Sequence, residues 1–244
     1  MKTKIVTCLT VLAFASGLAV ADADAATLAP GDTILMNGST AASHPELGGV
    51  VQQDQMLVTN EQQVPPEAAP FFNFADFNVQ NRVVRSDADG TMIFAPRIMF
   101  SRNVTPYPLL VNRVDIWGFG DFEIDATYRT DGLGDRGPTN GSRSAGGDML
   151  SFDFGFPLFI NNSFVGPQEE SYFFSLKTDA TKFENTGRLS IFATALGDPV
   201  PGREYRFDVG GLAVPTAVAV VPVPASLPLL AIALCWMGLC RRRA

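Results

Sequence analysis

Cysteine is absent from the central part of this sequence. All three cysteines, Cys8, Cys235 and Cys240, lie in the first ten or the last ten residues of the 244-residue chain. The part between them therefore has no disulfide, no thiol nucleophile and no zinc–thiolate site. Core packing has to stabilise it, and 19 phenylalanines supply much of the apolar area.

Histidine and tryptophan are also scarce. His44, in the segment SHPELGG, is the only histidine. A catalytic histidine needs an oriented partner and a nucleophile, and neither is visible here, so we expect His44 to be an exposed loop residue beside Pro45. Trp117 is the only tryptophan outside the C-terminal end. We expect it at a strand end, in the core or as a platform for a sugar.

Basic residues are fewer than acidic residues in this sequence. The chain has 18 basic and 25 acidic residues. Residues 1–25 and 221–244 hold five of the basic and two of the acidic ones, so the net charge between them is −10. Nucleic acids and anionic lipids are bound by clustered Lys and Arg. The charge therefore argues against either as a partner, and acidity alone is usually a solubility feature.

Residues 1–25 show the three zones of a secretory signal peptide. Two lysines precede an apolar run, which the small-residue stretch ADADA follows. Ala21 with Ala23, or Ala23 with Ala25, forms the A-x-A pattern that signal peptidase reads, so we expect cleavage after Ala23 or Ala25. A buried helix or a permanent membrane anchor is the alternative, but the run is short for either.

The last 24 residues combine prolines, an apolar stretch and a basic cluster. Pro222 and Pro224 favour an extended backbone. From Ala225 to Cys240 only Ser226 is polar, and a helix there would span roughly 24 Å, somewhat less than a hydrocarbon core of about 30 Å. We expect a transmembrane helix over residues 226–240. Residues 241–244 would form a basic tail that stops transfer, through Arg241, Arg242 and Arg243.

This tail resembles the VPLPA variant of PEP-CTERM sorting signals, on the residues Val221-Pro222-Val223-Pro224-Ala225 followed by an apolar run and RRR. Val223 departs from the more usual leucine. The resemblance implies a Gram-negative bacterium and recognition by exosortase, a membrane-embedded cysteine transpeptidase usually encoded with exopolysaccharide and biofilm-matrix genes. The protein would be exported, anchored transiently in the inner membrane, processed at residues 221–225 and left at the cell surface or in the matrix. An ordinary C-terminal anchor is the alternative.

Between the ends, residues 26–220 show period-two patterns and no sustained helical periodicity. Four patterns predict strands with one buried face: Met92, Phe94, Ile98 and Phe100; Phe122, Ile124, Ala126 and Tyr128; Leu150, Phe152, Phe154 and Phe156; and Leu189, Ile191, Ala193 and Ala195. Weaker strands are expected at 50–58, 77–85, 111–118 and 172–178. Eight to ten strands over this length predict one all-β domain, an antiparallel two-sheet β-sandwich.

Three connections stand out from these strands. Asp89-Gly90 predicts a hairpin turn, since glycine readily takes a positive φ. Residues 60–72 are polar and proline-rich, which predicts a surface loop. Residues 130–148 are dense in Gly, Asp and Ser and predict a long irregular loop of the functional or mobile kind.

The middle of the chain also resembles the uncharacterised β-rich domain of many PEP-CTERM-anchored proteins. The likeness rests on RVVRSDADGTMIF, WGFGDFEIDATYRTDGLGDRGP, SRSAGGDMLSFDF and SYFFSLKTDATKFENTGRLSIF. Such domains have no established activity to carry over. The likeness therefore supports the β architecture and adds nothing about chemistry.

Carboxylates invite one metal hypothesis. Asp131, Asp135 and Asp148 lie in or beside the glycine-rich loop and could gather around calcium, which takes oxygen ligands from flexible loops. The D-x-D-x-D-G calcium pattern is missing, and Asp87-Ala88-Asp89-Gly90 matches it at two positions only. We therefore expect turn chemistry and no cofactor, with calcium as the alternative.

Carboxylates also invite one catalytic hypothesis, because glycosidases use two carboxyl groups across a sugar-binding cleft. Glu123 and Asp125 alternate with Ile124 and should share the outward face of a strand, which a solvated sheet face explains equally well. No triad, dyad or phosphate-loop context is present, so we assign no catalytic residue and no metal ligand and expect no enzyme. The expected role is structural or adhesive in an exopolysaccharide matrix. A carbohydrate-binding module is the alternative, and a glycosidase the third.

Overall fold

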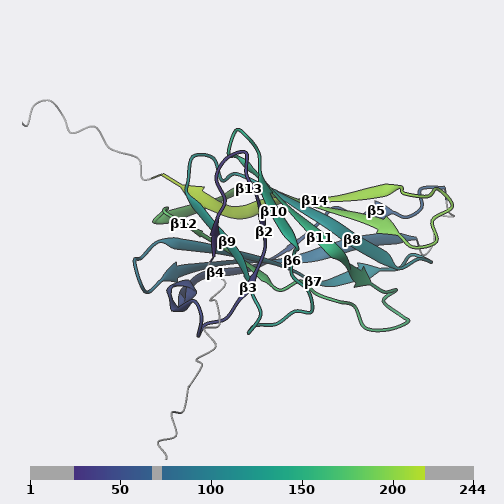
Figure 1. Ribbon diagram of the computed structural model, residues 1–244. Helices are drawn as coiled ribbons and strands as arrows, with labels where there is room; N and C mark the ends of the chain where they lie inside the picture. The colour runs from purple at the N-terminus through teal and green to yellow at the C-terminus, as the bar shows by residue number, and fades with distance from the viewer. Residues whose placement is uncertain (1–24, 68–72, 218–244) are drawn as a thin grey trace, which may run out of the picture.

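The computed structural model describes residues 25–67 and 73–217, which form two β-sheets packed face to face in a sandwich-like arrangement (Figure 1). In this part of the chain the only helical element is the 3₁₀ turn η1 (Pro45–Leu47), and no helix is long and apolar enough to cross a membrane. The all-β prediction is confirmed. The expected signal helix and C-terminal helix lie outside the described residues.

The first sheet has eight strands in the order β1-β9-β12-β7-β6-β4, with β3 beside β9 and β5 beside β6. All its pairings are antiparallel except that of β3 with β9. The strands are β1 (Ala26–Thr27), β3 (Gly38–Ser39), β4 (Gly49–Val58), β5 (Gln62–Gln63), β6 (Phe74–Ser86), β7 (Met92–Asn103), β9 (Ile124–Arg129) and β12 (Phe173–Thr178).

The second sheet has six antiparallel strands in the order β14-β13-β8-β11-β10-β2. They are β14 (Glu204–Thr216), β13 (Lys182–Ala195), β8 (Leu109–Trp117), β11 (Met149–Ile160), β10 (Asn140–Arg143) and β2 (Thr33–Leu35). The eight strands located from sequence are therefore confirmed, but the described residues form 14 strands, more than the eight to ten expected. β14 was missed, because Gly210 and Gly211 interrupt its apolar pattern.

The core lies between the two sheets and is rich in phenylalanine. Phe77 on β6 meets Phe207 on β14 edge-to-face, with ring centroids 4.7 Å apart. Phe152 on β11 and Phe174 on β12 make a second pair across the sheets at 4.9 Å. All four rings are fully buried, so aromatic packing joins the layers in a part of the chain without cysteine.

Two β-bulges overturn the predicted burial of two phenylalanines. Between Met99 and Arg102, β7 carries one residue more than the paired part of β6, which reverses the facing of β7 and leaves Phe100 60% exposed. β11 slips against β8 between Asp153 and Leu158, and Phe156 in that stretch is 76% exposed. The predictions for Phe100 and Phe156 were wrong, because bulges depend on the partner strand.

Of the three predicted connections, the turn is confirmed, whereas each of the two loops contains a strand. The turn between β6 and β7 is confirmed, with Gly90 at φ 75° and the carboxylate of Asp89 accepting a 3.0 Å hydrogen bond from the Thr91 amide. The predicted loop at 60–72 instead contains β5 and the fully buried Val64. The predicted loop at 130–148 contains β10, which pairs with both β2 and β11.

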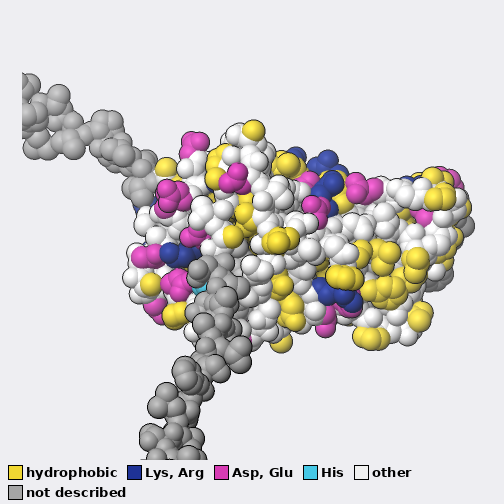
Figure 2. All heavy atoms as spheres, viewed as in Figure 1, with side chains coloured by type: hydrophobic (Ala, Val, Ile, Leu, Met, Phe, Trp, Pro, Cys, Tyr) yellow, Lys and Arg dark blue, Asp and Glu magenta, His cyan; other side chains and the backbone are white. Residues whose placement is uncertain are grey.

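The surface of the described residues is mixed. Acidic side chains are scattered over the face shown in Figure 2, with basic and apolar ones between them. Phe156, Phe164 and Val165 are the most exposed of the large apolar side chains among the described residues.

Candidate functional site

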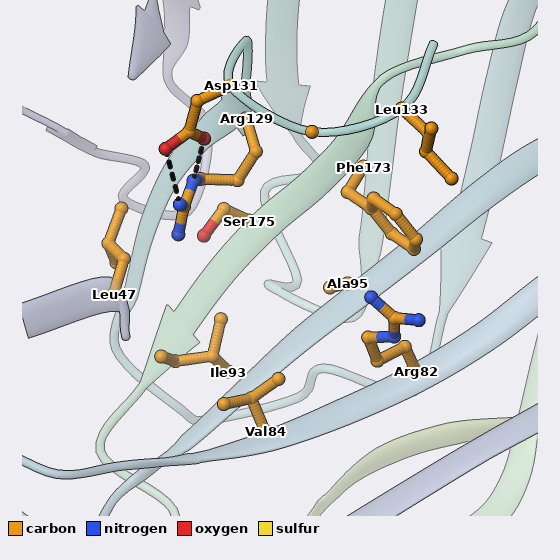
Figure 3. Close-up of a pocket in the computed structure, with 11 residues that line it drawn as sticks. Leu47, Arg82, Val84, Ile93, Ala95, Arg129, Asp131, Leu133, Phe173 and Ser175 are labelled. Carbon is orange, nitrogen blue, oxygen red and sulfur yellow. Dashed lines mark hydrogen bonds and ion pairs between the residues drawn. The ribbon is translucent and has the colours of Figure 1, made fainter. Parts of the chain in front are cut away.

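A groove of about 270 Å³ lies on the outer face of the eight-stranded sheet (Figure 3). Four neighbouring strands and two loops line it. The residues are Arg129 on β9, Phe173 and Ser175 on β12, Ile93 and Ala95 on β7, Arg82 and Val84 on β6, Leu47 in η1, and the loop residues Asp131, Gly132 and Leu133.

Strand alternation determines which side chains reach this face. On β12 the core takes Phe174 and Leu176, so Phe173 and Ser175 point outward. The outward residues are nevertheless mostly buried, because two covering segments, residues 41–47 and 131–133, border the groove and β3 continues the sheet beside β9. Thr127 on β9, for instance, donates a 2.5 Å hydrogen bond to the carbonyl of Asn37. The groove is the opening that remains between these covering segments.

Arg129 and Asp131 form one wall. Nε and Nη2 of Arg129 each donate a 2.9 Å hydrogen bond to a different oxygen of Asp131. The Arg129 guanidinium holds the pKa of Asp131 below its ordinary value. The amide of Ala41 donates a further 2.6 Å hydrogen bond to Asp131, which ties the loop after β9 to the covering segment.

Arg82 lies at the opposite side of the groove. Its guanidinium carbon lies 4.4 Å from the centroid of the Phe173 ring, a cation–π distance. Nη2 and Nε of Arg82 donate to one oxygen of Asp54 on β4, at 2.6 and 3.2 Å. Asp54 does not line the groove, so the groove itself presents two guanidinium groups and one carboxylate.

Ser175 supplies a hydroxyl that the described residues do not use. The residue is 2% exposed, and its Oγ makes no hydrogen bond within residues 25–67 and 73–217. In the same part of the chain, every fully buried side-chain nitrogen or oxygen has a partner, so this hydroxyl must be open to the groove that it lines. Figure 3 shows it beside the Arg129 guanidinium.

Most predicted site residues lie outside the described part of the chain. These are Ala23, the sorting motif Val221, Pro222, Val223, Pro224 and Ala225, and the basic cluster Arg241, Arg242 and Arg243. Ala25 is the first described residue and directly precedes β1.

His44 contradicts its prediction as an exposed loop residue. It is 4% exposed, because the segment that contains it packs over the first sheet. Its Nδ1 lies 2.8 Å from Oε1 of Glu46, and its amide donates to the carbonyl of Thr40. His44 is not among the residues that line the groove, although Leu47 in the same segment is.

The three loop aspartates are not brought together. Asp131 is bonded to Arg129, whereas Asp135 accepts a 2.8 Å hydrogen bond from the amide of Glu170. Within the described ranges, no three His, Asp or Glu side chains are grouped in a way that could hold a metal ion. The calcium alternative gains no support from this geometry.

Glu123 and Asp125 flank the buried Ile124 and are more exposed than it, as the alternation predicts, although Glu123 precedes β9. Asp125 accepts a 2.7 Å hydrogen bond from the hydroxyl of Thr27. Glu123 lines a second hollow of about 570 Å³, which Asp125 does not line. The two carboxylates therefore do not face each other across a shared cleft.

Trp117 is the last residue of β8, so the prediction of a strand end is confirmed. The guanidinium carbon of Arg188 lies 4.2 Å from its ring centroid and covers one face. A free stacking platform for a sugar is therefore not present on that face of Trp117.

Sequence reasoning missed the groove, because its lining residues come from four strands that are far apart along the chain. One signal of the groove was available in the sequence: strand alternation places Arg82 on β6, and Phe173 and Ser175 on β12, on the outer face of the sheet. Comparison of the chain with family models, curated proteins and solved structures finds no match.

Proposed function

We propose that this chain is an exported surface protein of a Gram-negative bacterium, sorted by exosortase and structural or adhesive in an exopolysaccharide matrix. One observation carries the proposal: VPVPA at residues 221–225, an apolar run and three arginines follow one another at the C-terminus. That order suits a processing site, a membrane-spanning segment and a stop-transfer signal.

The arrangement of the chain ends supports this proposal. Thr27 pairs with Asp125 and Thr216 pairs with Lys182, in the same half of the sandwich (Figure 1). A membrane attachment beyond residue 217 would leave the other half facing away from the membrane. That half carries the loops at 104–108, 161–172 and 196–203, which would be free to meet other matrix components.

The mature C-terminus tests the sorting proposal. We expect mass spectrometry of surface-extracted protein to find a chain that ends within or next to residues 221–225 and lacks the three arginines. Replacing Pro222 and Pro224 by alanine should leave the tail uncut, because the motif is lost. Pro199-Val200-Pro201 repeats the same triplet inside the domain, so the Pro199→Ala/Pro201→Ala variant is the matched control. An intact tail on unmodified surface material would contradict the proposal.

A second candidate function is carbohydrate binding. The groove supports carbohydrate binding, because it combines an apolar floor with guanidinium groups and an unused hydroxyl. This composition suits a polar ligand that has an apolar face. We expect the mature protein to bind selected oligosaccharides on a glycan array. Signals no higher than those of a heat-unfolded sample would rule this candidate out.

A further inference from the structure

We propose that the groove on the eight-stranded sheet binds the carboxylate of an acidic sugar, with Arg82, Arg129 and Ser175 as its polar contacts. This inference rests on the carbohydrate-binding candidate and deepens it, because it names the class of sugar. We expect uronic acid units to bind in the groove and neutral sugars to bind weakly.

The charge of the groove differs from that of the rest of the domain. The net charge of residues 26–220 is −10, whereas two guanidinium groups and a single carboxylate line the groove. Asp54 pairs with Arg82 and Asp131 pairs with Arg129, so the charges around the groove balance. A carboxylate ligand is therefore repelled less here than by the rest of the acidic surface. The lining residues Ile93, Ala95 and Ser175 are at most 7% exposed, so a hydrogen bond from an arginine to a carboxylate seated on them is screened less than on an open surface.

Both arginines keep a donor for a ligand. The hydrogen bonds of Arg129 and Arg82 with the described residues use Nε and Nη2 only, which leaves Nη1 of each side chain for another acceptor. The planar guanidinium presents its donors in a fixed fork that matches a carboxylate. Asp131 already demonstrates this match, because it accepts two bonds from Arg129 at 2.9 Å.

The position of Ser175 distinguishes this groove from two ion pairs that happen to lie close together on the surface. The residue is almost fully buried, yet its hydroxyl has no partner within the described ranges and opens into the groove. It lies on β12 two residues from Phe173, which pairs with Arg129 on β9, so the hydroxyl and this guanidinium are diagonal neighbours. A carboxylate or ring hydroxyl between them would satisfy both.

The remaining lining suits the C–H face of a sugar ring. Phe173, Ile93, Val84 and Ala95 form an apolar floor between the two arginines, and Leu133 borders it from the loop. The volume of about 270 Å³ lies at the lower end of small-molecule pockets, so it accommodates about one sugar unit of a longer polymer.

Calorimetric titration of the mature protein with oligogalacturonate and oligoglucuronate tests the proposal. The fully methyl-esterified oligomers are the matched probes, because they keep the sugar and remove the charge. We expect the acid forms to bind at least tenfold tighter than the esters. Equal affinities would overturn the carboxylate assignment and leave carbohydrate binding intact, whereas no binding to any oligosaccharide would overturn both.

Substitutions of groove residues test where the acid oligomer binds. Ser175→Ala and Arg82→Gln should each weaken binding of the acid oligomer about tenfold or more, with melting curves that establish a folded state. Arg206→Gln is the control, because Arg206 lies on the second sheet with its guanidinium 5.8 Å from the Phe192 ring and outside the groove. Unchanged binding in Ser175→Ala, or an equal loss in Arg206→Gln, would overturn the proposed site.

Discussion

At the scale of single residues, Arg143 shows how this domain handles a buried charge. The side chain is on β10 and the residue is 5% exposed, and burial lowers the pKa of its guanidinium. It donates hydrogen bonds to four backbone carbonyls between 2.6 and 3.1 Å away, those of Gly147, Leu28, Gly120 and Phe122. One guanidinium thus ties together three segments that are distant in sequence.

Loss of Arg143 should therefore destabilise the domain. We expect Arg143→Gln to lower the free energy of unfolding by about 3 kcal/mol, because several buried carbonyls lose a charged donor. Urea titration measures this value. Arg206→Gln removes a guanidinium from a side chain that is 46% exposed and should cost less than about 1 kcal/mol. Similar losses in the two variants would contradict the role assigned to Arg143.

Tyr205 provides a test in alkaline solution. Burial, together with its hydrogen bond to Asp198, raises the pKa of Tyr205 to about 12. An unfolded tyrosine titrates near pH 10, so the folded state holds this proton more tightly. The resulting stabilisation is complete below pH about 10 and is lost as the pH rises towards about 12. We expect the free energy of unfolding to fall over this interval, and to fall less in Tyr205→Phe. Identical pH profiles would contradict this assignment.

At the scale of elements, strand pairing decides which phenylalanines are buried. Along β11 the alternation holds from Leu150 to Phe154, fails at Phe156 and resumes at the buried Leu158 and Ile160, because β11 slips against β8 between Asp153 and Leu158. The same failure occurs on β7 at Phe100, where the strand carries an extra residue. In both strands an irregularity in strand pairing removes one phenylalanine of a regular apolar pattern from the core.

Two phenylalanines of β11, Phe152 and Phe156, should respond differently to truncation. Phe152 is fully buried against Phe174, so we expect Phe152→Ala to lower the free energy of unfolding by about 3–5 kcal/mol. Phe156 is 76% exposed, and Phe156→Ala should change that free energy by less than about 0.5 kcal/mol. Chemical denaturation of both variants measures the difference. A large loss of stability in Phe156→Ala would contradict the exposed position of Phe156.

At the scale of the whole molecule, one continuous core joins the sheets. It contains residues from β6, β7 and β12 of the first sheet and from β8, β11, β13 and β14 of the second. No covalent cross-link contributes between residues 26 and 217, because that part of the chain has no cysteine. Folding therefore depends on bringing distant strands together.

A single core predicts a single transition. We expect residues 26–217 alone to unfold in one cooperative step, because no part of the core is separate from the rest. The melting temperature should be the same with and without dithiothreitol. Two transitions in calorimetry would contradict the single-core description and indicate two domains.

The sequence by itself determined the all-β class, the positions of eight strands, the turn at Asp89-Gly90 and the absence of disulfides from the domain, because these depend on local alternation, glycine conformation and composition. The PEP-CTERM resemblance of the C-terminal tail also rests on sequence alone. Only the tertiary structure decided the burial of His44, the exposure of Phe100 and Phe156, and the meeting of Arg82, Arg129 and Ser175 in one groove. These features depend on strand register and on loops that cover a sheet, and both are set by contacts between residues far apart in the chain.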